Sequence, residues 1–152
     1  DHDWQLDLAV LEPPADATPE EAEDFLPEPP LVIGDEARLR QVVVNLLANA
    51  RVHTPAGSHV TTTLAREGDT LIVRIHDDGP GIAPDVRDRL FERFARGDSS
   101  RERRTGSTGL GMSIALAIVQ SHGGSIDVDS STAPEDHGTT FSVRLPAAVV
   151  EE

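Results

Sequence analysis

The clearest apolar pattern in the chain lies between residues 39 and 50. Apolar residues recur there every three or four positions, at Leu39, Val42, Val43, Leu46, Leu47 and Ala50. That spacing predicts a helix with one continuous core-facing side. Asp35 precedes it as a suitable N-cap, and Pro55 and Gly57 follow as a stop signal.

Strand patterns flank this helix. Apolar and polar residues alternate from Trp4 to Val10, which predicts a half-buried strand. Residues 60–66 and 71–76 predict a hairpin that turns at 67–69. A final pair of strands is expected at 126–128 and 141–145, around a loop that contains Pro134 and Gly138.

Two further helices are expected, at 84–94 and at 110–119, the second ending at Gly123-Gly124. Hairpins with helices between them predict an α+β fold: a two-layer sandwich of a mixed sheet of about five strands, with three main helices on one face. We expect one domain over residues 1–152. Residues 11–30 are acidic and proline-rich, which predicts a surface loop or a partly disordered insertion, with a short helix allowed at 19–25 after Thr18.

Composition removes several classes of function. There is no cysteine, which excludes disulfides and thiolate chemistry, and no apolar run is long enough for a membrane span. The net charge of −14 argues against a nucleic-acid partner. All 13 basic residues are arginine, so the lysine that P-loop and protein-kinase ATP sites require is missing.

A glycine-rich loop, Thr105 to Met112, leads directly into the 110–119 helix. Glycine lets the backbone approach a ligand, and a helix start offers unpaired N–H groups, so this is a candidate phosphate site. Seven arginines lie between 87 and 104, just before the loop. Each alone is best explained as a solvated surface residue, but together they are typical of an anion-attracting rim.

Two polar motifs occur in or directly after predicted apolar elements. Asn45 and Asn49 lie one turn apart on one face of the first helix, either as two exposed polar positions or as ligands of a shared group. The second strand of the first hairpin runs into the sequence DDGPGI, from Asp77 to Ile82. By itself that sequence is an ordinary turn.

In this order, these motifs resemble the ATP-binding catalytic domain of bacterial sensor histidine kinases, a member of the Bergerat-fold (GHKL) superfamily of gyrase B, Hsp90 and MutL. The resemblance covers residues 35–146 and includes an Asn-x-x-x-Asn helix, Asp-x-Gly-x-Gly, Phe91 and Phe94, and Gly-x-x-Gly-Leu-Gly. It implies that the protein binds ATP and Mg²⁺, and that residues 95–108 form an ATP lid. Without nucleotide we expect residues 96–106 to be mobile or disordered and residues 108–111 to be fixed at the helix start.

The resemblance also assigns site residues. Asn49 corresponds to the Mg²⁺ ligand and Asn45 to its neighbour in the metal and triphosphate site, while Asp77 corresponds to the acceptor for the adenine amino group. The remaining candidates for ATP binding are His53, Gly79, Gly81, Ile82, Arg96, Thr108, Gly109, Leu110, Gly111 and Thr140. His53 occupies one of two positions where many relatives have Lys-Tyr, so a phosphate-binding lysine is absent, and Arg51 or the arginines before the glycine loop are candidates to replace it.

Hydrolysing members of the superfamily have a glutamate where this chain has Asn45, so we expect transfer of the γ-phosphoryl group rather than hydrolysis. None of the six histidines has the setting of the family's phosphoacceptor, which implies a separate dimerisation domain. A degenerate regulatory module, or an anti-sigma-type serine kinase of the same fold, is the alternative. The resemblance further implies a response-regulator partner, a membrane-bound parent with this domain in the cytoplasm, and a monomeric isolated domain.

Overall fold

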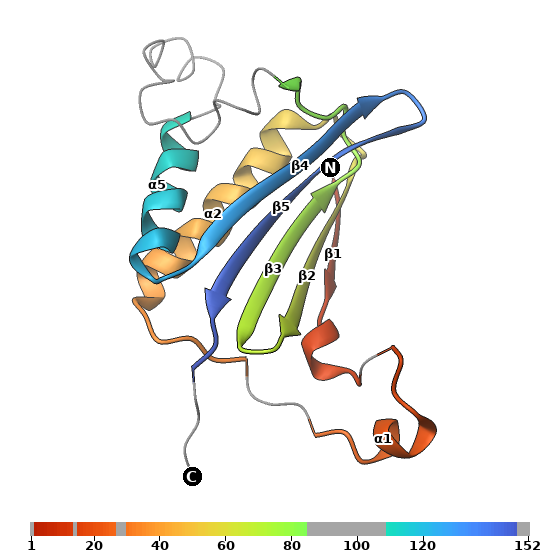
Figure 1. The fold of residues 1–152 in the computed structure, drawn as a ribbon. Coiled ribbons are helices and arrows are strands. Elements are labelled where there is room, and N and C mark those ends of the chain that lie inside the picture. Colours follow the sequence, from red (N-terminus) through yellow and green to blue (C-terminus); the bar gives the residue numbers. More distant parts are fainter. Residues whose placement is uncertain (1, 14, 27–29, 85–108, 149–152) are drawn as a thin grey trace.

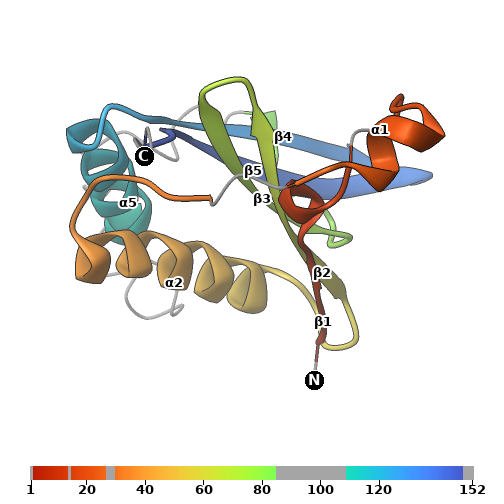
Figure 2. The same cartoon turned by 90° about the horizontal axis from the view of Figure 1, so that it is seen from below.

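The computed structural model describes residues 2–13, 15–26, 30–84 and 109–148. Within them, five strands form one sheet in the order β1-β2-β3-β5-β4. Two long helices, α2 (Glu36–His53) and α5 (Gly109–Ser121), lie side by side on one face of it (Figures 1 and 2). The strands are β1 (Asp3–Asp7), β2 (His59–Glu67), β3 (Thr70–Asp77), β4 (Ser125–Ala133) and β5 (Asp136–Pro146). The expected two-layer α+β sandwich is therefore confirmed.

The sheet is mixed because its first pair is parallel. β1 runs parallel to β2, whereas β2–β3, β3–β5 and β4–β5 are antiparallel. In the β3–β5 pair, Ile75 lies opposite Phe141 and Asp77 lies opposite Thr139. Side chains alternate between the two faces of a strand, so all four point toward the helices.

The core lies between the two helices and this face of the sheet. Its fully buried members include Leu46 of α2, Val119 of α5 and Ile75 of β3. Replacing a side chain as deeply buried as Leu46 by alanine costs about 2–5 kcal/mol of folding free energy in proteins generally. This packing sets where the ends of α2 and β3 lie, and the functional candidates cluster at those ends.

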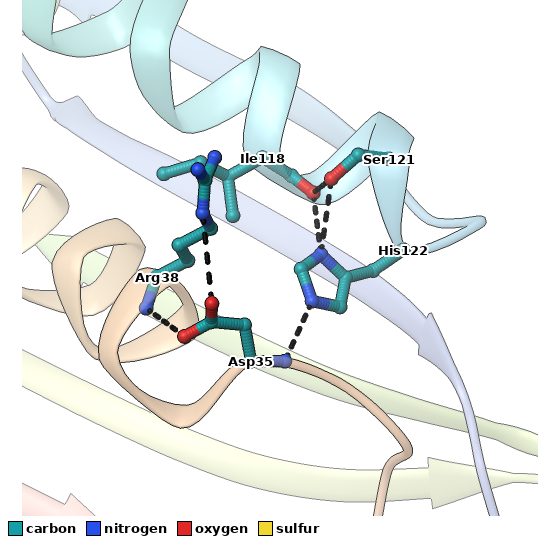
Figure 3. Close-up of polar contacts among 5 residues, drawn as sticks. All are labelled: Asp35, Arg38, Ile118, Ser121 and His122. Carbon is teal, nitrogen blue, oxygen red and sulfur yellow. Dashed lines mark hydrogen bonds and ion pairs between the residues drawn. The ribbon is translucent and has the colours of Figure 1, made fainter.

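The start of α2 is tied to the end of α5 (Figure 3). The Asp35 carboxylate caps α2 by accepting the Arg38 N–H at 3.1 Å. The Asp35 N–H in turn donates to Nε2 of His122 at 3.0 Å, and Nδ1 of His122 lies 2.7 Å from the Ile118 carbonyl oxygen. Because a backbone N–H can only donate and a carbonyl can only accept, His122 carries its proton on Nδ1.

The N-terminal strand differs from the prediction of a half-buried strand. β1 spans only Asp3–Asp7, all five residues are exposed, and a short 3₁₀ helix, η1 (Ala9–Leu11), follows. β1 is the edge of the sheet, where its side chains have a neighbouring strand on one side only. The alternating pattern identified the strand correctly but not its burial.

The acidic region contains the short helix that its sequence allowed. α1 (Pro19–Glu23) begins with a capping box in which the Thr18 side chain accepts the Glu21 N–H at 3.2 Å, and the Glu21 carboxylate accepts the Thr18 N–H at 2.7 Å. The third main helix and the lid, which we expected at 84–94 and 95–108, lie outside the described residues apart from Pro84. Among the described helices, none is long and apolar enough to cross a membrane.

Candidate functional site

The end of β3 adjoins both the end of α2 and the β4–β5 hairpin, because Gly79 packs against Thr54 and Gly81 against Ser131. Asp77, the last residue of β3, is buried with 6% of its surface exposed. Its Oδ1 accepts the N–H of Gly79 at 3.0 Å, and its Oδ2 receives no hydrogen bond from the described part of the chain. One oxygen of a buried carboxylate is thus available as an acceptor.

The adjacent aspartate, Asp78, forms hydrogen bonds with the backbone of β2. Asp78 Oδ1 accepts the backbone N–H of His59 at 2.7 Å, and the Asp78 N–H bonds the His59 carbonyl at 3.2 Å. These bonds extend the pairing of β2 and β3 past the end of the sheet. Asp78 is therefore engaged in structure, which leaves Asp77 as the carboxylate for a ligand.

Burial raises the pKa of the Asp77 carboxyl above its ordinary value of 3.8, and the nearby Asp78 acts in the same direction. The Gly79 N–H and the neighbouring histidines, His76 and His53, partly offset that rise in pKa. A desolvated carboxylate is costly unless donors satisfy it. The site therefore favours a ligand that brings a hydrogen-bond donor to Asp77.

Two glycines let the segment after Asp77 fit between its neighbours. A Cβ on Gly79 would lie 2.5 Å from Cγ2 of Thr54, the residue that ends α2. Gly81 has φ +83°, and a Cβ there would lie 2.0 Å from the Ser131 carbonyl oxygen. Both predicted glycines therefore occupy places that larger residues cannot enter without displacing neighbours.

The polar candidates on α2 form one stripe. Asn45, Asn49 and His53 are four residues apart, so they lie on adjacent turns of one helix face. Both asparagines are half-buried, rather than exposed as in the simpler of the two interpretations. Gln41 Nε2 donates to Oδ1 of Asn45 at 2.5 Å, while the Asn49 side chain has no hydrogen-bond partner among the described residues.

His53 connects this stripe to Asp77. Partial desolvation lowers the pKa of its imidazole, and the Asp77 carboxylate opposes that change. Thr54, the residue after His53, packs against Gly79. The structure therefore brings the α2 stripe and the Asp77–Ile82 segment to one site.

The side chains near Asp77 also indicate which kind of metal ion could bind. In the described ranges there is no group of three or more histidine, cysteine, aspartate or glutamate side chains that could hold an ion. Asparagine oxygens are neutral hard donors, which suit a Mg²⁺ ion that keeps most of its waters and bridges phosphates. Asn45 and Asn49 fit such an ion only if a ligand supplies the negative charge.

The phosphate-binding candidates are described in part. Arg96 and Thr108 lie outside the described residues, whereas Gly109, Leu110 and Gly111 form the first turn of α5. A helix of 13 residues that begins at the glycine loop agrees with the expected helix start. Its first N–H groups are free of intrahelical partners, as at any helix N-terminus.

The threonine near this site is Thr139, not Thr140. Thr140 points to the opposite face of the sheet, where its hydroxyl lies 2.7 Å from Nδ1 of His76. Thr139 lies opposite Asp77 on the helix-covered face and is buried, with 4% of its surface exposed. The sequence prediction named Thr140, whereas the threonine on the same face as Asp77 is its neighbour Thr139, since one position along a strand reverses the face.

Ile82 is the last residue of the Asp77–Ile82 segment. Its side chain packs against the core, and its N–H donates to Oγ of Ser130 at 2.7 Å. Thr54, Ser130 and His137 also contact this segment, although the sequence did not identify them. The three residues lie far from the segment along the chain and belong to no local motif, so no signal in the sequence could identify them.

Comparison with known proteins shows the family of the chain. Residues 34–149 match the family described as histidine kinase-, DNA gyrase B-, and HSP90-like ATPase. The probable sensor histidine kinase TcrY of Mycobacterium tuberculosis is 47% identical over 146 residues, which cover 96% of this chain and 26% of TcrY. The chain thus spans about a quarter of that relative.

Solved structures show the same fold. The mycobacterial sensor histidine kinase MprB superposes with a TM-score of 0.70 at 27% identity, covering 98% of this chain and 84% of that structure. Full-length ShkA in complex with AMPPNP gives a TM-score of 0.69 at 26% identity, covering 99% of this chain and 27% of ShkA.

Proposed function

This chain belongs to the family of histidine kinase-, DNA gyrase B-, and HSP90-like ATPases, and we propose that it is the catalytic ATP-binding domain of a sensor histidine kinase. It binds Mg-ATP and donates the γ-phosphoryl group to a histidine on a separate dimerisation domain. The observation that carries this proposal is the buried Asp77 carboxylate, with one oxygen held by Gly79 and the other available.

Asp77 recognises the adenine ring. Its free oxygen accepts a hydrogen bond from the exocyclic amino group, which offsets the cost of burying the carboxylate. Gly79 and Gly81 keep side chains out of the path of the base, and Thr139 stands beside Asp77 on the same face. A guanine ring would place a carbonyl oxygen against the carboxylate, so adenine nucleotides are preferred.

The triphosphate lies between the α2 stripe and the start of α5. Asn49 and Asn45 contribute amide oxygens to Mg²⁺, and the N–H groups of the α5 N-terminus, with Gly109, Leu110 and Gly111, bind phosphate oxygens. When bound, Mg²⁺ neutralises charge on the phosphates. Arg96, Thr108 and His53 complete the proposed set.

Arg51 is the candidate to replace the missing lysine. It lies in the last turn of α2, two residues before His53, and is exposed. An Arg51→Ala variant with unchanged ATP affinity would remove it from the phosphate site. In that case the arginines between 87 and 104 remain as the sources of positive charge.

Asn45 favours transfer over hydrolysis. An amide cannot take a proton from water at neutral pH, so this position provides no general base. Phosphoryl transfer instead depends on positioning and charge neutralisation, which permits the acceptor histidine to belong to another domain. Rapid hydrolysis of ATP by this chain would contradict the proposal.

The partners follow from the same proposal. They are ATP, the dimerisation domain of the parent protein and a response regulator, with the domain facing the cytoplasm from a membrane-bound parent. The alternative, a degenerate regulatory module, predicts weak or Mg²⁺-independent nucleotide binding. The asparagine at position 45 argues against the anti-sigma-type serine kinases, which have glutamate there.

Phosphotransfer in trans tests the reaction. The chain is mixed with Mg-ATP labelled at the γ-phosphate and with a separately produced dimerisation domain of a related sensor kinase, such as TcrY. The proposal expects acid-labile label on that domain and none on this chain. Label on this chain alone, or release of free phosphate without transfer, would overturn it.

A further inference from the structure

The tip of the β4–β5 hairpin holds the segment from Asp77 to Ile82 by two side chains. Nδ1 of His137 lies 2.6 Å from the carbonyl oxygen of Gly79. A carbonyl can only accept, so Nδ1 carries the proton and donates it. On the other side of Gly81, Oγ of Ser130 accepts the N–H of Ile82 at 2.7 Å.

The Ser130 hydroxyl is itself fixed by its own strand pair. It donates to the Gly138 carbonyl at 3.0 Å and lies 2.8 Å from Oγ1 of Thr139. A serine hydroxyl has one proton, so the Thr139 hydroxyl is the donor in the second contact. Ser130 therefore links the position of Ile82 to that of Thr139, the residue opposite Asp77.

Close packing adds to these bonds. Gly81 approaches the Ser131 carbonyl so closely that a Cβ would lie 2.0 Å from it. The β4–β5 hairpin therefore forms a hydrogen bond with each end of the segment from Gly79 to Ile82. In the middle of the segment, at Gly81, the hairpin leaves no room for a side chain. A shift of the hairpin would carry this segment, and the Asp77 carboxylate before it, along with it.

We propose that His137 and Ser130 are positioning residues for nucleotide recognition: they hold the Asp77–Ile82 segment so that the carboxylate meets the amino group of adenine, and so set the preference for adenine over guanine nucleotides. The inference rests on the proposed function. A displacement of about 1 Å at a binding group is enough to weaken recognition strongly. A displaced Asp77 would bind adenine less well and would also reject guanine less strongly.

Two histidine replacements separate positioning from general stability. In His137→Asn, the amide nitrogen takes the place of Nδ1 and can still donate to Gly79. In His137→Gln the amide reaches instead toward the position of Nε2 and does not make that bond. Both are neutral polar residues of similar size, so they serve as a matched pair, and Glu135→Ala in the exposed turn serves as the control.

The measurement is the affinity of the chain for Mg-ATP and Mg-GTP by calorimetry, with thermal unfolding of each variant alongside. We expect His137→Gln and Ser130→Ala to lose about three- to tenfold in ATP affinity, the range for one hydrogen bond. The ratio of ATP to GTP affinity should fall by a similar factor. His137→Asn and Glu135→Ala should retain the wild-type ratio.

The two proposals fail in different ways. No binding of Mg-ATP by the wild-type chain would overturn the proposed function itself. Wild-type binding with the same ATP-to-GTP ratio in His137→Asn and His137→Gln would overturn the positioning role alone, even if both lowered the unfolding temperature. If Ser130→Ala does not fold, the histidine pair decides the question.

Discussion

Asp77 and Thr139 lie directly opposite each other on β3 and β5, and both side chains are buried on the face that the helices cover. Thr140, the next residue, bonds His76 on the other face. Replacing threonine by valine removes a hydroxyl at nearly constant volume. Thr139→Val should weaken ATP binding about three- to tenfold, and Thr140→Val should leave it unchanged. A loss confined to Thr140→Val in calorimetry would reverse this assignment.

Asp77 is expected to destabilise the empty protein. Its folded-state pKa is raised by burial, so ionising it costs folding free energy. That cost is absent below the ordinary value of 3.8 and grows as the pH rises through the raised pKa. Asp77→Asn keeps an oxygen for the Gly79 N–H but has no charge. The variant should therefore unfold at a higher temperature than wild type at pH 7, with the difference shrinking on acidification.

The Asp77→Asn variant should also bind ATP more weakly. A hydrogen bond to a charged group is worth more than one to a neutral amide, so we expect a loss of about ten- to a hundredfold in affinity. Greater stability with weaker binding would be the sign of a site that sacrifices stability for recognition. If Asp77→Asn were less stable than wild type at pH 7, the cost of burying the Asp77 charge would not be the main contribution of this residue to the free energy of unfolding.

Gly81 should tolerate no side chain. Gly81 and Gly57 both have positive φ, +83° and +89°, but only Gly81 has neighbours within 4 Å of a Cβ. Gly57→Ala should cost about 1–2 kcal/mol for the left-handed backbone alone. Gly81→Ala should cost more than about 3 kcal/mol, because the added carbon meets a backbone carbonyl. Urea unfolding of both variants measures the difference, and equal costs would mean that the segment moves freely away from the hairpin.

His122 should contribute to stability without contributing to nucleotide binding. It links Asp35 at the start of α2 to Ile118 near the end of α5 by two hydrogen bonds (Figure 3), whereas the segment after Asp77 packs against the opposite end of α2. His122→Ala should lower the free energy of unfolding by about 1–3 kcal/mol. Exposed Gln120, on the same helix, supplies the control Gln120→Ala. Equal unfolding free energies for the two variants would show that the histidine link is not needed.

Local patterns predicted most of the fold because each element carries its own signal. The spacing of Leu46 and its neighbours identified α2, the Asp35 cap located its start, and the turn around Gly68 identified the β2–β3 hairpin. The exposure of β1 was missed because alternation reports which face a residue occupies. It does not report whether anything covers that face.

The candidate site could be named from the sequence in so far as it consists of contiguous motifs. Asp77, Gly79, Gly81 and the two asparagines could be named from the sequence, and the structure brings them to the same end of the fold. Thr139, Ser130 and His137 could not be named because their positions beside the Asp77–Ile82 segment depend on the register of β3, β4 and β5. A shift of one residue in that register exchanges Thr139 with Thr140, and no local pattern fixes it.

Calorimetric titration of this chain with ATP, with and without Mg²⁺, measures directly whether it binds Mg-ATP. Asn49→Asp and Asp77→Asn are titrated alongside. We expect saturable binding that strengthens with Mg²⁺ in wild type, altered Mg²⁺ dependence in Asn49→Asp, and weakened binding in Asp77→Asn. Absence of Mg²⁺-dependent binding in a folded wild-type chain would contradict the proposed function.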